Sequence, residues 1–221
     1  MSLSDKHIDR ISLHNVCPEV FSNEEVRASG LWLEDFEFKR GCNYTIEAGS
    51  GTGKSSLCSF IYLERKDYRG TIAFDTQDTK SLSMSEICAV RQRHIALLPQ
   101  ELRLFPELSV LDNIGLKNSL TDFNTEDEII EMLAYLGIKD KAHTLTGRLS
   151  IGQMQRVAMV RALCQPFDFI LLDEPVSHLD KENNLIAAGL ILEEARKQGA
   201  SIITTSVGNP LLLPETEYIK L

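Results

Sequence analysis

The sequence predicts an α/β fold centred on a mainly parallel sheet, with N-terminal antiparallel β elements and a helical subdomain. Strand-like and helix-like segments alternate along the 221 residues. Apolar runs at residues 95–98, 169–172 and from 202 onward are continuous, as parallel strands buried on both faces require. Between residues 100 and 165 only helical patterns occur. These three observations together favour helices packed around a sheet, with one helical insertion.

The N-terminal part shows β patterns of a different kind. Residues 11–13 and 31–33 have the period of two expected of half-buried strands. A strand at 43–48 ends in a glycine-rich turn, and a helix follows from Lys54 to about residue 65. A short strand at 71–74 comes after a glycine. We expect these elements to lie beside the parallel sheet.

Three further helices are indicated by their end signals. Thr125 and Glu128 form a capping box ahead of an apolar face with helical spacing, and Gly137 ends that helix. A second helix starts at Ser150, with Gln153 three positions on, and continues to about residue 164. The last runs over about 181–197, with Asp180 as N-cap and Gly199 beyond its end. The chain is thus predicted to be a single domain, with a core at 1–92 and 164–221 and a helical subdomain at 100–163.

Composition excludes several functional classes. The chain has 23 basic and 32 acidic residues, a formal net charge of −9, which argues against binding nucleic acid through bulk charge. The longest apolar stretch, 185–192, is far shorter than the ~20 residues that span a bilayer. Residues 1–10 lack the pattern of a signal peptide, so we expect a cytoplasmic protein. The five cysteines form no CxxC pair and suggest neither a zinc site nor a disulfide framework.

The glycine-rich turn has the residues that phosphate binding needs. It follows a strand and opens a helix, so backbone N–H groups and the helix N-terminus can surround phosphate oxygens. Lys54 is expected to reach the β- and γ-phosphates, and the Ser55 hydroxyl to coordinate Mg²⁺. The residues expected to bind the nucleotide are Gly49, Ser50, Gly51, Thr52, Gly53, Lys54, Ser55 and Ser56. The loop predicts a site for ATP and Mg²⁺.

Two carboxylates stand at the end of the apolar run 169–172. Asp173 is suited to hold Mg²⁺, directly or through water. Glu174, one residue further, can face the attacking water as a general base or orienting group. Because ligands of open α/β sheets bind at the carboxyl edge of the strands, we expect both residues to lie near the phosphate loop.

Residues 149–158, Leu-Ser-Ile-Gly-Gln-Met-Gln-Arg-Val-Ala, resemble the signature motif of ATP-binding cassette (ABC) proteins. Other segments fall in family order: 98–100 resembles the Q-loop, 169–174 the Walker B strand and 177–180 the D-loop. Gln153 precedes Asp173 by 20 residues, a spacing similar to that of the family. The resemblance covers about residues 8–206. Residues 103–110 are also similar to the cassettes of lipoprotein release, macrolide export and cell division.

The resemblance implies a P-loop NTPase core with a helical signature subdomain, and an ATPase that drives transport. Ser150, Gly152 and Gln153 would face the γ-phosphate held by a second cassette, in a homodimer or heterodimer closed around two ATP molecules. Gln100 would contact Mg²⁺ or the attacking water. An integral membrane permease on a separate chain would seat near Gln100, which would place the protein at the inner face of the cell membrane. No nucleic-acid partner is expected, and the transported substrate and its direction stay open.

Three positions depart from the family pattern. Ala48 stands where the phosphate loop usually begins with glycine, and Ile151 replaces the first glycine of the signature. Ser206 occupies the place of the switch histidine, so its hydroxyl could bond the γ-phosphate but supplies no positive charge. Since loss of one transition-state donor commonly costs a factor of ~10² to 10³ in rate, slow hydrolysis with retained binding is expected. The alternative function is a slow or catalytically impaired ATP switch that regulates a membrane or protein partner.

The family places an aromatic residue some two dozen positions before the phosphate loop, where it stacks on adenine. Phe21 is the candidate for this role, with Tyr44 and Trp32 as aromatic residues that could instead be structural.

Overall fold

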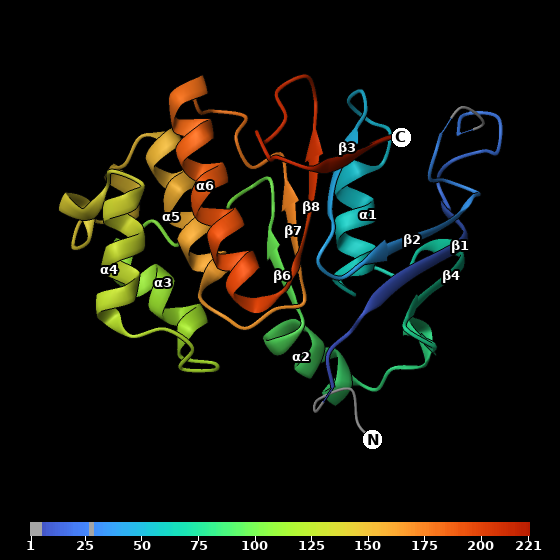
Figure 1. The fold of residues 1–221 in the computed structure, drawn as a ribbon, viewed down its shortest axis with the longest axis horizontal. Coiled ribbons are helices and arrows are strands. Elements are labelled where there is room, and N and C mark those ends of the chain that lie inside the picture. Colours follow the sequence, from blue (N-terminus) through green and yellow to red (C-terminus); the bar gives the residue numbers. More distant parts are fainter. Residues whose placement is uncertain (1–5, 27–28) are drawn as a thin grey trace.

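A five-stranded parallel sheet forms the centre of the molecule in the computed structural model, which describes residues 6–26 and 29–221. Its strands run in the order β6-β7-β8-β3-β9 (Figure 1). Their bounds are Asn43–Glu47 for β3, Ile95–Leu98 for β6, Phe169–Asp173 for β7, Ser201–Ser206 for β8 and Thr216–Lys220 for β9. Every pairing is parallel, which confirms the fold class.

An antiparallel sheet of order β2-β1-β4-β5 lies beside it (Figure 1). These strands are Arg10–Pro18 (β1), Asp35–Lys39 (β2), Tyr68–Phe74 (β4) and Gln77–Asp78 (β5). The strand predicted at 31–33 is wrong. Leu31 and Trp32 are buried, but they lie in a turn that packs on the core, and Leu33 has a φ of 65°, which breaks an extended backbone.

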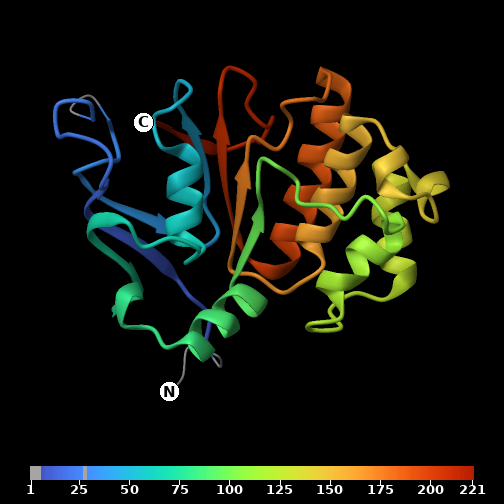
Figure 2. The same ribbon diagram turned by 180° about the vertical axis from the view of Figure 1, so that it is seen from behind.

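The described part of the chain forms six α-helices, which pack around the parallel sheet. They are Lys54–Ile61 (α1), Met84–Arg93 (α2), Val110–Asn118 (α3), Glu126–Tyr135 (α4), Ile151–Leu163 (α5) and Lys181–Gln198 (α6). Figures 1 and 2 show α3, α4, α5 and α6 gathered at one end of the molecule, with α1 on the opposite side of the sheet. The segment 100–163, for which the sequence shows only helical patterns, forms α3, α4 and α5, and α6 of the predicted core packs beside them.

Most of the predicted helix ends are confirmed. Thr125 and Ser150 form capping boxes with Glu128 and Gln153, and the Asp180 side chain accepts a hydrogen bond from the Asn183 N–H. The helix after the phosphate loop is shorter than expected. It ends at Ile61 because the chain turns there, and Leu63 has a φ of 63°.

Two hydrophobic cores fill the two faces of the parallel sheet. Ile170 and Leu172 of β7 face the core that includes α3–α6, whereas Phe169 and Leu171 face the core shared with α1 and the antiparallel sheet. Consecutive residues of one strand thus enter different cores. Both faces are buried, which explains the continuous apolar run in the sequence.

A buried carboxylate ties the two sheets together at the amino end of β7. Asp168 accepts hydrogen bonds from the Ile8 N–H at 2.9 Å, from His94 Nδ1 at 2.7 Å and from His7 Nδ1 at 2.6 Å, and pairs with Arg40. Burial alone would raise the pKa of Asp168, but the hydrogen bonds from His94, Ile8 and His7 outweigh burial and lower it. The cluster lies at the edge opposite Asp173 and has a structural role.

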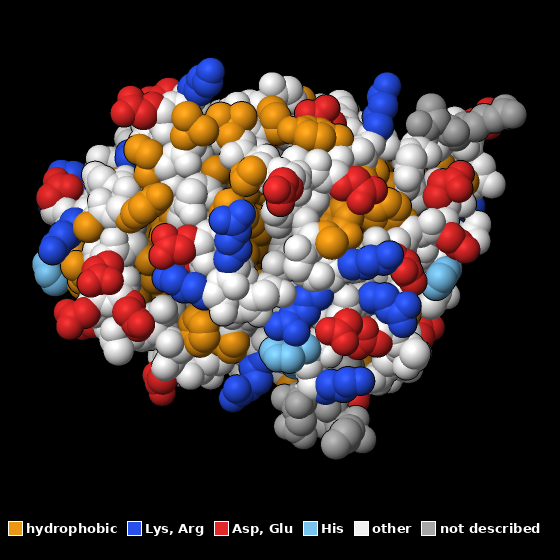
Figure 3. Space-filling view, in the orientation of Figure 1, with side chains coloured by type: hydrophobic (Ala, Val, Ile, Leu, Met, Phe, Trp, Pro, Cys, Tyr) orange, Lys and Arg blue, Asp and Glu red, His pale blue; other side chains and the backbone are white. Residues whose placement is uncertain are grey.

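The surface carries charges of both signs. Figure 3 shows acidic and basic side chains interspersed on the face seen there. Among residues 6–26 and 29–221, no helix is both long and apolar enough to cross a membrane. All five cysteines are free thiols, with Cys17, Cys58 and Cys164 buried and Cys42 and Cys88 exposed.

Candidate functional site

The predicted phosphate loop, Gln100, Asp173, Glu174 and Ser206 lie along the carboxyl edge of the parallel sheet. Gln100 lies just beyond β6, Asp173 ends β7, Ser206 ends β8, and the phosphate loop follows β3. These four strands are neighbours in the order β6-β7-β8-β3. Their register pairs Leu98 with Leu172, Asp173 with Thr205, and Glu47 with Ser206. Parallel pairing therefore gathers residues more than a hundred positions apart along one edge.

The phosphate loop is a turn that only certain residues can form. Gly51 and Gly53 have φ values of 81° and 96°, in the left-handed region that favours glycine. A Cβ at Gly53 would lie 3.0 Å from the Phe21 ring and 3.2 Å from Trp32. The first turn of α1 has no side-chain cap and no acidic residue, so its N–H groups are available to an anion.

Lys54 is buried inside this loop, with 5% of its surface exposed. Its ammonium donates to the Gly49 carbonyl at 2.7 Å and to the Ala48 carbonyl at 3.2 Å, and lies 4.0 Å from Glu174 Oε1. The cation is thus held by neutral acceptors of its own loop, beside the carboxylate proposed to act on water. It lies where phosphate oxygens would replace the carbonyls.

The two serines after Lys54 differ in their surroundings. Ser55 is exposed and has no hydrogen-bond partner among the described residues, so its hydroxyl is open to a ligand. Ser56 is partly buried, and its hydroxyl accepts a hydrogen bond from Arg65 at 3.3 Å.

A threonine that no sequence motif identified holds the Asp173 carboxylate and the backbone of Glu174. The Thr205 hydroxyl donates to Asp173 Oδ1 at 2.7 Å and accepts from the Glu174 N–H at 3.1 Å. Glu174 has a φ of 50°, and its carbonyl accepts from Gln155 Nε2 at 3.2 Å. Hydrogen bonds on both sides of this residue therefore fix a backbone conformation that is costly for a non-glycine residue. A polar pair in an otherwise apolar strand was the available signal.

Asp173 also affects a neighbouring thiol. Cys58 on α1 is fully buried, and burial raises its pKa well above the usual value, with the Asp173 carboxylate adding to the increase. The thiol therefore stays protonated and acts as an apolar packing group beneath the site.

Ser206 is almost completely buried, with 1% of its surface exposed, and its hydroxyl has no partner among the described residues. Its carbonyl accepts a hydrogen bond from the Ala48 N–H at 3.3 Å, which places Ser206 at the entry of the phosphate loop. A buried hydroxyl without a partner is unfavourable unless a ligand or water satisfies it.

The signature residues lie at the start of α5. Ser150 and Gln153 bond to each other in the capping box, with distances of 3.0 and 3.3 Å. Ile151 keeps 46% of its surface exposed. A Cβ at Gly152 would lie 3.2 Å from the His178 carbonyl, so a small residue is needed where the loop after β7 packs on this turn.

Two more predicted residues flank the nucleotide edge. Gln100 is exposed and makes no hydrogen bond within the described part of the chain. Phe21 lies beside Gly53 and lines a cavity of about 260 Å³ with Trp32 and Thr52. Trp32 is buried and donates from Nε1 to the Thr52 carbonyl at 3.0 Å.

Tyr44 is part of the core. It is 2% exposed, packs against Phe36 and Phe38, and accepts a hydrogen bond from the Lys39 N–H at 2.9 Å. Burial raises the pKa of Tyr44 to about 12. The side chain has a structural role, as the alternative interpretation expected.

The metal expected from the sequence fits the residues present. The described residues contain no group of three His, Cys, Asp or Glu side chains that could hold a metal ion. One carboxylate and one hydroxyl, Asp173 and Ser55, lie at the phosphate-binding edge. This is the sparse oxygen donor set with which proteins bind Mg²⁺ together with substrate phosphates.

Comparison with known proteins agrees with this geometry. Residues 34–177 match the family model described as ABC transporter. The chain is 33% identical over 168 residues to the macrolide export ATP-binding/permease protein MacB of Bartonella henselae, covering 75% of this chain and 25% of MacB. It is 32% identical to the methionine import ATP-binding protein MetN 1 of Bacillus thuringiensis, covering 75% of this chain and 49% of MetN 1. The chain thus spans a quarter to about half of these relatives.

Solved structures share the whole fold. The dimeric structure of MJ0796, a bacterial ABC transporter cassette, aligns with a TM-score of 0.78 and 25% identity over 95% of this chain and 94% of that one. A dimeric post-hydrolysis state of MJ0796 bound to ADP and Pi aligns with a TM-score of 0.75 and 25% identity, over 89% of this chain and 87% of that one.

Proposed function

This chain belongs to the ABC transporter family of ATP-binding cassettes, and from that premise we propose that it binds and hydrolyses ATP to drive a membrane permease on a separate chain. The observation that carries the proposal is the meeting of Lys54, Asp173 and Glu174 at one sheet edge, with Glu174 Oε1 4.0 Å from Lys54 Nζ. A phosphate-binding cation and a water-activating carboxylate are thus adjacent.

Each group at this edge has a defined task. Lys54 and the N–H groups of the phosphate loop bind the β- and γ-phosphates. Glu174 orients the attacking water and takes its proton, while the water oxygen bonds to Pγ and the bridging bond breaks with its electron pair leaving on ADP. Ser55 and Asp173, with Gln100 just beyond the end of β6, would hold Mg²⁺, which when bound neutralises phosphate charge. Ser206 would place its hydroxyl toward the γ-phosphate.

Two copies of the chain would complete each site. Ser150, Gly152 and Gln153 start α5 on an exposed turn, and the N–H groups there can bind an anion supplied by a partner. MJ0796, with which the chain aligns over nearly its whole length, is described as dimeric. We propose a dimer in which each signature faces the phosphate loop of the other copy.

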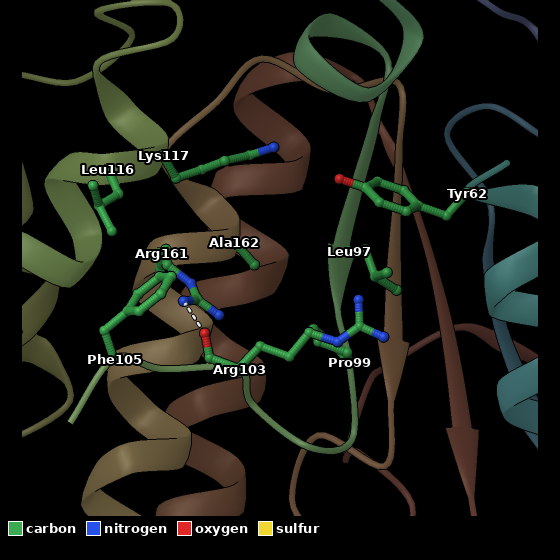
Figure 4. Close-up of a pocket in the computed structure, with 9 residues that line it drawn as sticks. All are labelled: Tyr62, Leu97, Pro99, Arg103, Phe105, Leu116, Lys117, Arg161 and Ala162. Carbon is green, nitrogen blue, oxygen red and sulfur yellow. Dashed lines mark hydrogen bonds between the residues drawn. The ribbon is translucent and has the colours of Figure 1, made fainter. Parts of the chain in front are cut away.

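A pocket beyond Pro99 is the proposed seat of the permease (Figure 4). It has a volume of about 240 Å³ and lies between β6, α3 and α5. Figure 4 shows Lys117 and Arg161 extending into it, with Tyr62 and Leu97 on another side. Burial, then the nearby Arg161, lower the pKa of Lys117 to about 8. Neither cation forms an ion pair with a carboxylate among the described residues.

The chemistry of this pocket indicates what the permease segment must carry. Partly buried cations without a counter-charge are unfavourable, so a partner carboxylate would be stabilising. Phe105 and Leu116, which are about half exposed, offer apolar contact beside it. The segment should therefore combine an acidic side chain with an apolar one. Through it the chain would sit at the inner face of the cell membrane.

Ser206 favours a second candidate function. Its hydroxyl is buried and uncharged where the family places a histidine. If hydrolysis is slow for this reason, ATP would hold the dimer closed, and the output would be a regulated interaction with a membrane or protein partner.

The test is ATPase activity of the purified chain, with Glu174→Gln as the blank, alone and with a co-purified permease. Hydrolysis above the blank that rises with the permease supports the transport function. Tight ATP binding with a rate at the blank, with or without the permease, supports the switch. Lys117→Glu should remove the effect of the permease and leave the basal rate, whereas the exposed Lys139→Glu should change neither. No ATP binding to the wild type would refute both functions.

A further inference from the structure

His178 lies in the loop between β7 and α6, beside the start of α5. Its carbonyl is the atom that a Cβ at Gly152 would approach to 3.2 Å, and the same Cβ would lie 3.5 Å from Leu179. The histidine therefore lies next to the signature turn, and its side chain is exposed. Ser206, the residue in the family's histidine position, is buried at the other half of the site.

Gln155 fixes this loop on α5. The Gln155 side chain is 1% exposed; its Oε1 accepts from the His178 N–H at 3.2 Å, and its Nε2 donates to the Glu174 carbonyl at 3.2 Å and to Ser177 Oγ at 3.3 Å. One buried amide thus connects the signature helix to Glu174, Ser177 and His178. The loop is positioned by this network, so the place of His178 is determined by the fold.

The same network orients the imidazole. Ser177 Oγ lies 3.0 Å from His178 Nδ1. The Ser177 hydroxyl accepts a hydrogen bond from Gln155 and keeps its own proton for donation; when it donates to His178 Nδ1, the ring proton is on Nε2. No other hydrogen bond to this ring is formed within residues 6–26 and 29–221. In that tautomer the ring presents a free Nε2–H donor at the surface that carries the signature.

We propose that His178 of one copy donates a hydrogen bond to the γ-phosphate bound by the other copy, and so supplies an imidazole N–H donor where Ser206 offers only a hydroxyl. The proposal rests on the proposed function, since it needs ATP and the head-to-tail dimer. No bond of His178 forms or breaks. While the water oxygen bonds to Pγ and ADP leaves, Nε2–H stabilises the negative charge on the γ-phosphoryl oxygens.

The first test uses dimerisation, which does not depend on turnover. In a Glu174→Gln background, His178→Ala should weaken the ATP-driven dimer at least tenfold in sedimentation, because each of two sites loses a hydrogen bond to a charged group. ADP binding to the monomer should stay the same, since His178 acts on the other copy. The matched control is His143→Ala, which removes an exposed histidine elsewhere in the helical subdomain. An unchanged dimer would overturn the proposal.

The second test distinguishes action across the dimer from action within one copy. A mixed dimer of Lys54→Ala with His178→Ala keeps one complete site if His178 acts across the interface. A mixed dimer of the Lys54→Ala, His178→Ala double variant with wild type then has no complete site. We expect the first to be about 10²-fold more active than the second. The reverse order, or equal activity, would overturn the proposal.

The third test uses the serine. Ser206→His should raise the ATPase rate at least tenfold more in the His178→Ala variant than in the otherwise wild-type chain, because only that variant lacks an imidazole donor at the site. His178→Gln, which keeps an N–H donor, should lose less than His178→Ala. Equal effects of Ser206→His in both backgrounds would contradict the assignment. If the wild type binds no ATP, the proposed function fails as well; if it binds ATP and His178→Ala changes nothing, only the role of His178 fails.

Discussion

The two halves of the ATP site differ in how far the chain completes them. At the sheet edge, Lys54, Asp173 and Glu174 are buried or half-buried and bonded to neighbours from three adjacent strands and loops. At the start of α5, Ile151 and His178 are exposed, and the capping box there is satisfied within one turn. Under the proposed function, we expect the first half to bind a nucleotide in the monomer. We expect the second half to act only when another copy brings a bound phosphate to it.

The difference follows from the elements that carry each half. A sheet edge gathers groups from distant parts of the chain and excludes water from them, which strengthens their electrostatic interactions. A helix N-terminus offers N–H groups outward and needs only local residues. Substitutions should therefore distinguish the two halves. Changes at the sheet edge should alter nucleotide binding or hydrolysis, whereas changes at α5 should alter ATP-driven dimerisation and leave the nucleotide affinity of the monomer unchanged.

Lys54→Ala should have the largest effect. It removes the buried cation and its charged hydrogen bonds, each contributing ~1.5–3 kcal/mol, so we expect ADP affinity of the monomer to fall about 10²-fold or more. Titration calorimetry measures this, with the exposed Lys66→Ala as control. Unchanged affinity in Lys54→Ala would show that the sheet edge is not the phosphate site.

Thr205→Val should lower the ATPase rate about 10- to 100-fold, because Asp173 and the Glu174 N–H each lose a partner, a cost of ~1–3 kcal/mol. The free energy of unfolding should fall by a similar amount. Thr204→Val is the matched control. Thr204 is equally buried, but its hydroxyl has no partner in the described residues. Removing this hydroxyl should therefore leave the ATPase rate unchanged, and the free energy of unfolding should stay the same or rise. Chemical denaturation and steady-state kinetics measure both; equal effects would contradict the role of Thr205.

Phe21→Ala should weaken ATP binding about tenfold if the ring stacks on adenine, since stacking contributes ~1–3 kcal/mol per base. Binding of inorganic tripolyphosphate should not change, because it has no base. Phe36→Ala, a partly buried aromatic substitution on the antiparallel sheet, serves as control. A similar loss for both ligands would mean that Phe21 only supports Gly53.

Ser150→Ala should have the smallest effect and should act on the other half. Loss of the cap costs ~1 kcal/mol, so the ATP-driven dimer of the Glu174→Gln variant should weaken about fivefold while monomer ADP affinity stays the same. Ser150→Asp restores a cap but brings a negative charge toward the partner's phosphate. It should therefore recover helix stability and still weaken the dimer in sedimentation. A dimer as strong as wild type in Ser150→Asp would show that no anion approaches this turn.

Local signals in the sequence were sufficient for much of the fold. The runs at β6, β7 and β8 were predicted because both faces of the sheet are buried, and the caps at Thr125, Ser150 and Asp180 because each depends on three or four consecutive residues. The turn at 31–33 was misread because buried apolar residues in a turn resemble a short strand. Helix α2 was not anticipated, although Ser83 and Glu86 form a capping box at its start.

The sequence predicted the site less completely than the fold, because several contacts of the site join residues that are far apart in the sequence. The phosphate loop and the carboxylates have characteristic neighbours in the sequence. Thr205 reaches Asp173 across 32 positions, and Gln155 reaches Glu174 across 19 positions. These contacts depend on strand pairing and helix packing, which no local pattern specifies.

One consequence of the phosphate loop concerns the state without nucleotide. The Lys54 ammonium donates hydrogen bonds to the Gly49 and Ala48 carbonyls, so these two carbonyls occupy the donor that a phosphate would use. Binding is then an exchange, in which phosphate oxygens displace these carbonyls from the same donor. The affinity for phosphate therefore depends on how much more strongly Lys54 binds phosphate oxygens than the Gly49 and Ala48 carbonyls. A ligand must therefore offer acceptors stronger than peptide carbonyls, which multiply charged phosphate chains do and neutral nucleosides do not.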